Sequence, residues 1–146
     1  MVSILQGAVE RGTGKQARVS GHTIAGKTGT TNDVKDVWFV GFSKNLIAGV
    51  YLGYDTPKSL GKGAGSHMAA RVFADFMRVA LKDESNQPFP VPDGLSFVRV
   101  NRNTGVAASQ DPNGVIINEV FKPGQTPNQI QNMETTTEKP VVGGIF

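Results

Sequence analysis

Two segments of the chain carry apolar residues at helical spacing. The first covers residues 2–11, and Gly12 follows it where a left-handed residue commonly ends a helix. The second covers residues 66–82, with Ser66 in the position of an N-cap. The sequence therefore predicts two amphipathic helices. The side chains of the second that are expected to face a core are Ala69, Val72, Phe73, Phe76 and Ala80.

Three strands are predicted between these helices. They cover residues 23–31, Val37–Phe42 and residues 46–54, and a turn over residues 43–45 joins the second strand to the third. The second and third strands are apolar almost throughout instead of alternating, which predicts cover on both faces of the sheet. The expected fold is therefore α+β with α/β-type layering, an antiparallel sheet of about three strands flanked by helices.

The remainder of the chain has a different character. Two short strands are predicted at residues 97–101 and 115–121, and the turn residues 111–114 precede the second. Beyond them almost no residue could fill a core, which predicts a partly disordered C-terminal tail. The expected organisation is a main portion over residues 1–84, an extension over residues 85–121 and a tail over residues 122–146.

Composition narrows the possible partners. The chain has 146 residues, 38% of them hydrophobic, which suffices for the core of one domain. It has no cysteine, which excludes disulfides and thiolate metal sites, and no apolar run or basic leader that predicts a membrane span or secretory signal. The net charge is +3 without a basic run, and His22 and His67 are isolated. We therefore expect no nucleic acid, metal or cofactor.

The stretch GKTGTT, residues 26–31, places one cation among glycines and hydroxyls on a predicted strand. Strand alternation directs Lys27 and Gly29 to one face and Thr28 and Thr30 to the other. A ligand on one face would meet only half of them, whereas a ligand along the strand edge would meet all of them, and Gly29 would keep that edge uncrowded. Alone, the triplet K-T-G is also explained by a solvated lysine on an edge strand.

Its context makes the triplet more specific. The blocks GKTGTTND, DVWFVGFS, LIAGVYLGYD and AARVFADFM, with LQGAVERGTG before them and NEVFKPGQTP after them, resemble the last third of the transpeptidase domain in class A penicillin-binding proteins. The likeness covers residues 1–127. K-T-G belongs to the signature of these proteins and of class A β-lactamases, together with S-x-x-K and S-D-N. The fold implied is a fragment of the penicillin-binding and serine β-lactamase fold.

The resemblance implies an activity and a place. In this family a serine attacks a cell-wall stem peptide, releases its terminal D-alanine and passes the acyl group to an amine on a neighbouring strand. β-Lactams acylate the same serine. The reaction takes place on the periplasmic side of the cytoplasmic membrane, and the class A parent also carries a membrane anchor and a glycosyltransferase domain. The implied partners are peptidoglycan stem peptides and β-lactam antibiotics.

The resemblance also gives roles to individual residues. Lys27 would place a positive charge beside the nucleophile. Thr28 and Thr30 would offer hydroxyls to the substrate carboxylate, and the backbone N–H of Thr30 would be one of two oxyanion-hole donors. Gly29 and Thr31 would complete the substrate-binding edge. Lys27 and Thr30 are thus the candidate catalytic residues, and residues 28–31 the candidate substrate-binding residues.

The nucleophile is not expected within this chain. Residues 59–62 fit S-x-x-K and residues 43–45 fit S-x-N, but both follow K-T-G, and Ser59 lies among glycines and proline in a predicted loop instead of at a helix start. We therefore expect a carboxy-terminal fragment, inactive alone, whose partner is the missing N-terminal part. The alternative is a non-catalytic module that binds peptides or a partner strand along residues 26–31. A serine β-lactamase is disfavoured by the hairpin sequence and the long tail.

Overall fold

The computed structural model describes residues 1–61, 63–108 and 115–127, and the chain divides into two compact units. The first unit is Met1–Val91 and the second is Pro92–Phe146. The predicted limits at residues 84 and 121 stay predictions. The first unit contains α1 (Val2–Glu10), β1 (Ala25–Thr30), β2 (Val37–Phe42), β3 (Ile47–Leu52) and α2 (Ser66–Ala80), with short 3-10 turns η1 (Lys15–Ala17) and η2 (Asn32–Val34).

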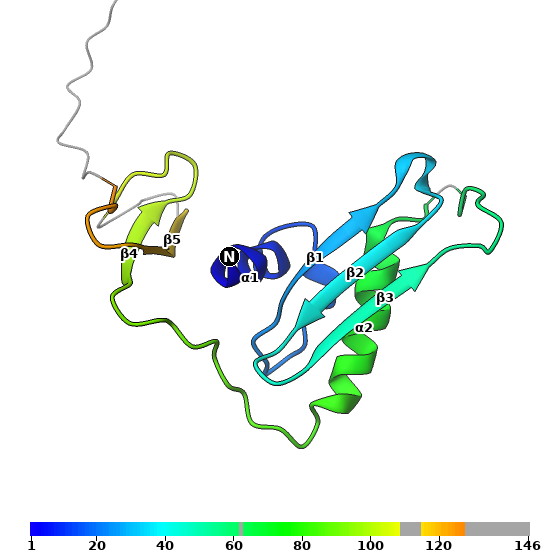
Figure 1. The fold of residues 1–146 in the computed structure, drawn as a ribbon, viewed down its shortest axis with the longest axis horizontal. Helices are drawn as coiled ribbons and strands as arrows, with labels where there is room; N and C mark the ends of the chain where they lie inside the picture. Colours follow the sequence, from blue (N-terminus) through cyan, green and yellow to red (C-terminus); the bar gives the residue numbers. More distant parts are fainter. Residues whose placement is uncertain (62, 109–114, 128–146) are drawn as a thin grey trace, which may run out of the picture. The chain divides into compact units, whose positions relative to one another are not determined.

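The strands of the first unit form an antiparallel sheet in the order β1-β2-β3 (Figure 1). β2 has the predicted bounds, and β1 and β3 are one or two residues shorter at their ends than predicted. The antiparallel sheet flanked by helices agrees with the predicted α+β fold. β2 is the central strand, so β1 and β3 each keep one side that pairs with no other strand among the described residues.

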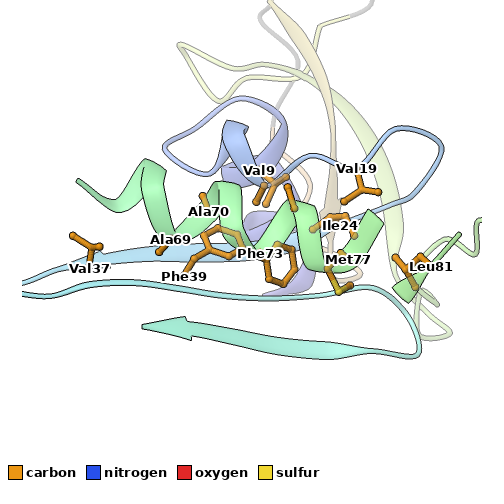
Figure 2. Close-up of a cluster of buried hydrophobic side chains, with 12 residues drawn as sticks. Val9, Val19, Ile24, Val37, Phe39, Ala69, Ala70, Phe73, Met77 and Leu81 are labelled. Carbon is orange, nitrogen blue, oxygen red and sulfur yellow. The ribbon is translucent and has the colours of Figure 1, made fainter. Parts of the chain in front are cut away.

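The core lies between the sheet and α2. Phe39 of β2 and Phe73 of α2 are fully buried, with ring centroids 4.7 Å apart. Val9 of α1 joins the same cluster, so both helices contribute to the core on this face of the sheet (Figure 2). Burial of such aromatic side chains is the main stabilising term available to a domain of this size. The buried cluster is completed by Ala17, Val19, Ile24, Val37, Ala69, Ala70, Ala74, Met77 and Leu81.

The opposite face of the sheet is largely open in the described residues. Trp38 and Val40 of β2 and Ile47 and Tyr51 of β3 are exposed there, whereas the alternate residues of β2 are buried. Among the described residues of the first unit the predicted cover on both faces is wrong, because both helices contribute to the core on the same face of the sheet. β2 is therefore apolar on both faces, but Val37 and Phe39 are buried, whereas Trp38 and Val40 are exposed in the described residues.

The first helix ends differently from the prediction. Its C-cap is Arg11, with φ −130° and ψ −12°, and Gly12 does not have a positive φ. The prediction of a left-handed Gly12 is therefore wrong. Glycine is required there for close approach, because a Cβ on Gly12 would lie 2.9 Å from the carbonyl oxygen of Ala8.

The second helix corrects two predictions. Its N-cap is Gly65, and Ser66 is the first helical residue without a capping side-chain hydrogen bond. Val72 and Phe76, predicted to face the core, are 47% and 51% exposed, and Ala80, predicted to do the same, is also exposed. The helix carries apolar residues on two stripes, and the stripe with the smaller side chains lies against the sheet. The buried residues are Ala69, Ala70, Phe73, Ala74 and Met77.

The described part of the second unit contains a two-stranded sheet. β4 (Ser96–Asn101) pairs antiparallel with β5 (Ile116–Phe121), which confirms the two predicted short strands. The predicted turn at residues 111–114, and most of the predicted tail, lie outside the described residues. Among the residues that are described, no helix is long and apolar enough to cross a membrane.

The two phenylalanines of α2 give a direct test of the observed core. We expect Phe73→Ala to lower the free energy of unfolding by about 3–5 kcal/mol, because it leaves a cavity in a packed core. The matched change Phe76→Ala, on the exposed stripe of the same helix, should change it by less than about 1 kcal/mol. Urea unfolding of both variants provides the measurement. Equal losses of unfolding free energy in the two variants would show that both phenylalanines lie in the core, as the sequence predicted.

Candidate functional site

The K-T-G residues lie on an edge strand whose outer side is open. In the described part of the chain, β1 pairs with β2 alone. The backbone N–H of Thr31 donates to the carbonyl of Asp36 over 3.0 Å, so Thr31 faces β2. Successive residues of an extended strand direct their backbone groups to opposite sides. The N–H and C=O groups of Thr30 and Thr28 therefore point away from β2, toward the open edge.

Lys27 and Thr28 meet at this edge although their side chains leave opposite faces of the strand. Lys27 pairs with Val40 and Thr28 with Phe39, so the lysine starts on the open face and the threonine on the core face. The Nζ atom of Lys27 donates to the carbonyl oxygen of Thr28 over 3.0 Å and to its Oγ1 over 3.1 Å. The lysine side chain thus bends around the edge, and the geometry brings cation and hydroxyl together.

A third polar side chain at this position was missed by sequence reasoning. The Oγ1 atom of Thr13, in the loop after α1, lies 2.8 Å from the Oγ1 of Thr28. The two residues are far apart along the chain, and no spacing rule connects them. The only local signal was the Gly-Thr-Gly sequence formed by Thr13 and its neighbours Gly12 and Gly14.

The remaining predicted residues occupy distinct positions. Thr30 is exposed at the end of β1, whereas the hydroxyl of Thr31 accepts a hydrogen bond from the backbone N–H of Asp36 over 2.9 Å. A Cβ on Gly29 would lie 3.3 Å from the Cβ of Trp38, which is tight contact. The structure therefore places Lys27, Thr28 and Thr30 along the edge, and holds Thr31 mainly against β2.

Asp36 joins the end of β1 to β3. Its carboxylate accepts a hydrogen bond of 2.7 Å from the hydroxyl of Tyr51, and its backbone bonds Thr31. The hydrogen bond to Asp36 raises the pKa of Tyr51, with smaller contributions from burial and from the negative charges of Asp36 and Asp55. Asp36 is thus a hydrogen-bonded partner at the strand end instead of a free surface charge.

The two motif-like serines both lie outside the helices, in a loop and a turn. Ser59 lies in the loop between β3 and α2, where its Oγ accepts a hydrogen bond from Gly61 N–H over 3.2 Å, and Lys62 lies outside the described residues. Ser43 caps the turn between β2 and β3 by accepting from Leu46 N–H over 3.2 Å. The described residues contain no group of three side chains that could hold a metal ion.

Comparison with known protein families gives a match over the first part of the chain. The family described as "Penicillin binding protein transpeptidase domain" matches residues 1–78, more than half of the 146 residues. The chain belongs to the penicillin-binding protein transpeptidase family. The matched region contains α1, the complete sheet and most of α2, so the whole K-T-G edge lies within it.

Individual members of the transpeptidase family show how much of the protein is represented. Penicillin-binding protein 1A of Rickettsia prowazekii is 50% identical over 135 residues, 92% of this chain and 16% of the relative. Penicillin-binding protein 1A of Neisseria gonorrhoeae is 47% identical over 97 residues, 65% of this chain and 12% of that relative. The chain therefore spans about one sixth of the length of the Rickettsia relative and a smaller share, 12%, of the Neisseria relative.

A solved structure supports the fold. The crystal structure of penicillin-binding protein 1A from Haemophilus influenzae matches with a TM-score of 0.69 and 29% sequence identity, over 86% of this chain and 20% of that one. The predicted fragment of the penicillin-binding fold is therefore confirmed.

The hydrogen bond between Asp36 and Tyr51 predicts that the pKa of Tyr51 depends on the Asp36 side chain. The sequence has two tyrosines, so Tyr54→Phe leaves Tyr51 as the only one to report in the ultraviolet absorbance of tyrosinate. In that background Asp36→Asn should lower the pKa of Tyr51 toward its ordinary value of about 10.

The same contact makes stability depend on pH. Because the pKa of Tyr51 is raised in the folded chain, its contribution is present below about pH 10 and is lost as pH rises through the folded pKa. Asp36→Asn should weaken this alkaline loss in urea unfolding. An unchanged Tyr51 titration in Asp36→Asn would show that the hydrogen bond is not the cause of the shift.

Proposed function

We propose that this chain supplies one side of the acylation site of a peptidoglycan D,D-transpeptidase. Membership of the transpeptidase family and the open β1 edge, with Lys27 bent around it, support the proposal. The observation that carries it is the direction of Thr30, whose backbone N–H points to the open edge because Thr31 is bonded to Asp36. A donor fixed in this way is what an oxyanion hole requires.

The other residues of the edge have complementary roles. Lys27 brings a positive charge and three N–H donors beside the place where a serine would react, which favours proton transfer and an anionic substrate. Thr28 and Thr30 offer hydroxyls to the substrate carboxylate. Gly29 leaves the backbone accessible, and Thr31 completes the edge mainly by fixing the turn to β2. No cofactor or metal takes part in this proposal.

The serine nucleophile would come from a part of the protein outside this chain. The matched segment is 16% of the Rickettsia prowazekii relative, so most of such a protein is not represented here. The exposed side chains of Trp38, Val40 and Tyr51 form a surface on which that part could pack. The full protein would act on the periplasmic side of the cytoplasmic membrane, with an anchor and a glycosyltransferase domain of its own.

A non-catalytic function is the second candidate. An open strand edge with outward backbone groups at Thr28 and Thr30 can accept an extended peptide as an added strand, without any covalent step. In that case the edge binds a peptide or partner, and Lys27 contributes only electrostatic attraction. The two candidates differ in whether a covalent adduct forms.

A fluorescent penicillin distinguishes them. This chain alone should remain unlabelled, whereas a chimera in which it replaces the matched segment of the Rickettsia prowazekii relative should become covalently labelled. In the chimera, Lys27→Ala should slow labelling by at least about 100-fold. This is the lower end of the range expected when a group that assists proton transfer is removed. Lys44→Ala is the matched control, since Lys44 hydrogen-bonds Gln87 outside the edge, and it should label normally.

Two results would contradict the transpeptidase proposal. A chimera that unfolds cooperatively, binds stem peptide and stays unlabelled would favour the peptide-binding function. A β-lactam adduct located by mass spectrometry on any serine of this chain would show that the nucleophile lies within these residues.

A further inference from the structure

We propose that Thr13 is a positioning residue that makes the hydroxyl of Thr28 a hydrogen-bond donor to the carboxylate of the ligand. This inference rests on the proposed function, because it assigns a second residue to the same ligand group. It adds a residue from the loop after α1 to a site otherwise built from β1.

The loop that carries Thr13 is held closely against its surroundings. The backbone N–H groups of Gly12 and Gly14 both donate to the carbonyl of Ala8, over 3.1 and 2.9 Å. A Cβ on Gly14 would lie 3.2 Å from that oxygen and 3.3 Å from the ring of Phe39, and one on Gly12 would be closer still to Ala8. Both neighbours of Thr13 are therefore fixed by close approach to α1 and to the core, which leaves its hydroxyl a defined position.

The hydrogen bonds around Thr28 explain what this hydroxyl does. A hydroxyl oxygen has two acceptor lone pairs and one proton to donate. Lys27 can only donate, so its contact with Thr28 Oγ1 at 3.1 Å occupies one lone pair. If Thr13 donates across the 2.8 Å contact, the second lone pair is also occupied. The only remaining interaction of the Thr28 hydroxyl is then donation of its own proton.

An anionic ligand selects this arrangement. The Thr13–Thr28 contact can form with either hydroxyl as donor, and only one of the two directions leaves the Thr28 proton available. A carboxylate at the open edge accepts hydrogen bonds but cannot donate one when ionised, so it favours the direction in which Thr13 donates. Thr13 therefore lowers the free-energy cost of orienting the Thr28 hydroxyl toward a carboxylate. A ligand without that charge gains little affinity from this orientation.

Acylation by two related penicillins tests this inference in the chimera. Thr13→Val removes the hydroxyl and keeps the shape of the side chain, whereas Thr13→Ser keeps the hydroxyl. We expect Thr13→Val to raise the half-saturating concentration of a penicillin with a free carboxylate roughly fivefold, the effect of one ordinary hydrogen bond, with little change in the maximal acylation rate. Its methyl ester should react as with the unchanged chimera, and Thr13→Ser should restore binding of the free acid.

A double-mutant cycle tests whether Thr13 acts through Thr28. In a Thr28→Val background, Thr13→Val should have no further effect on the free acid, because the hydroxyl that it orients is absent. Thr104→Val is the matched control, since the hydroxyl of Thr104 accepts a hydrogen bond from the backbone N–H of Val106 in the second unit. It should leave acylation by both penicillins unchanged.

Each other result has a defined meaning. A chimera without substitutions that unfolds cooperatively, binds stem peptide and stays unlabelled contradicts the proposed function itself. If that chimera labels, equal behaviour of Thr13→Val and the unchanged protein overturns the role of Thr13. Equal slowing with acid and ester, or loss of the unfolding transition in both Thr13→Val and Thr13→Ala, also overturns it, because the hydroxyl would then serve only the fold.

Discussion

The packing of one aromatic ring over two glycines fixes the edge on which the proposed site depends. Phe39 lies where side chains of Gly26 and Gly41 would otherwise be, since a Cβ on either would come within 2.7 Å of its ring. These glycines are direct partners in the β1–β2 register, and Phe73 covers the ring from α2. The ring therefore packs against β1 and the central strand on the core face of the sheet, while the outer side of β1 stays open.

This packing explains part of the composition of β1 in structural terms. Gly26 gives room to Phe39, and Gly29 avoids a close contact with Trp38, so both glycines have a reason that needs no ligand. Lys27 and Thr30 have no comparable role in the core, because both are exposed. The sequence predicts that Gly29 leaves room for an approaching ligand backbone, which stays a prediction, and the structure adds a neighbouring side chain on β2 that a Cβ there would also crowd.

The sequence predicted those features that depend on local pattern. β2 was predicted with its observed bounds because five of its six residues have strong strand character, between turn signals. Strand alternation predicted that Lys27 and Thr28 leave opposite faces of β1, as their partners Val40 and Phe39 show, but it did not predict the contact that the bent lysine side chain makes with Thr28. The face of α2 was predicted only in part, because the helix has two apolar stripes and only contact with the sheet selects one: Ala69 and Phe73 are buried, whereas Val72 and Phe76 are exposed. Thr13 was missed because its contact with Thr28 depends on tertiary packing.

The turn after β1 shows how the direction of Thr30 is maintained. Asp33 and Val34 have φ values of 60° and 52°, and a β-branched residue in this region costs about 1–3 kcal/mol. Val34 is held there by hydrogen bonds from its own N–H to Thr31 and from Leu60 to its carbonyl. The chain thus reverses directly after Thr31 and returns to β2 at Asp36. A relaxed and longer turn would let the end of β1 rotate, and the outward N–H of Thr30 would lose its fixed direction.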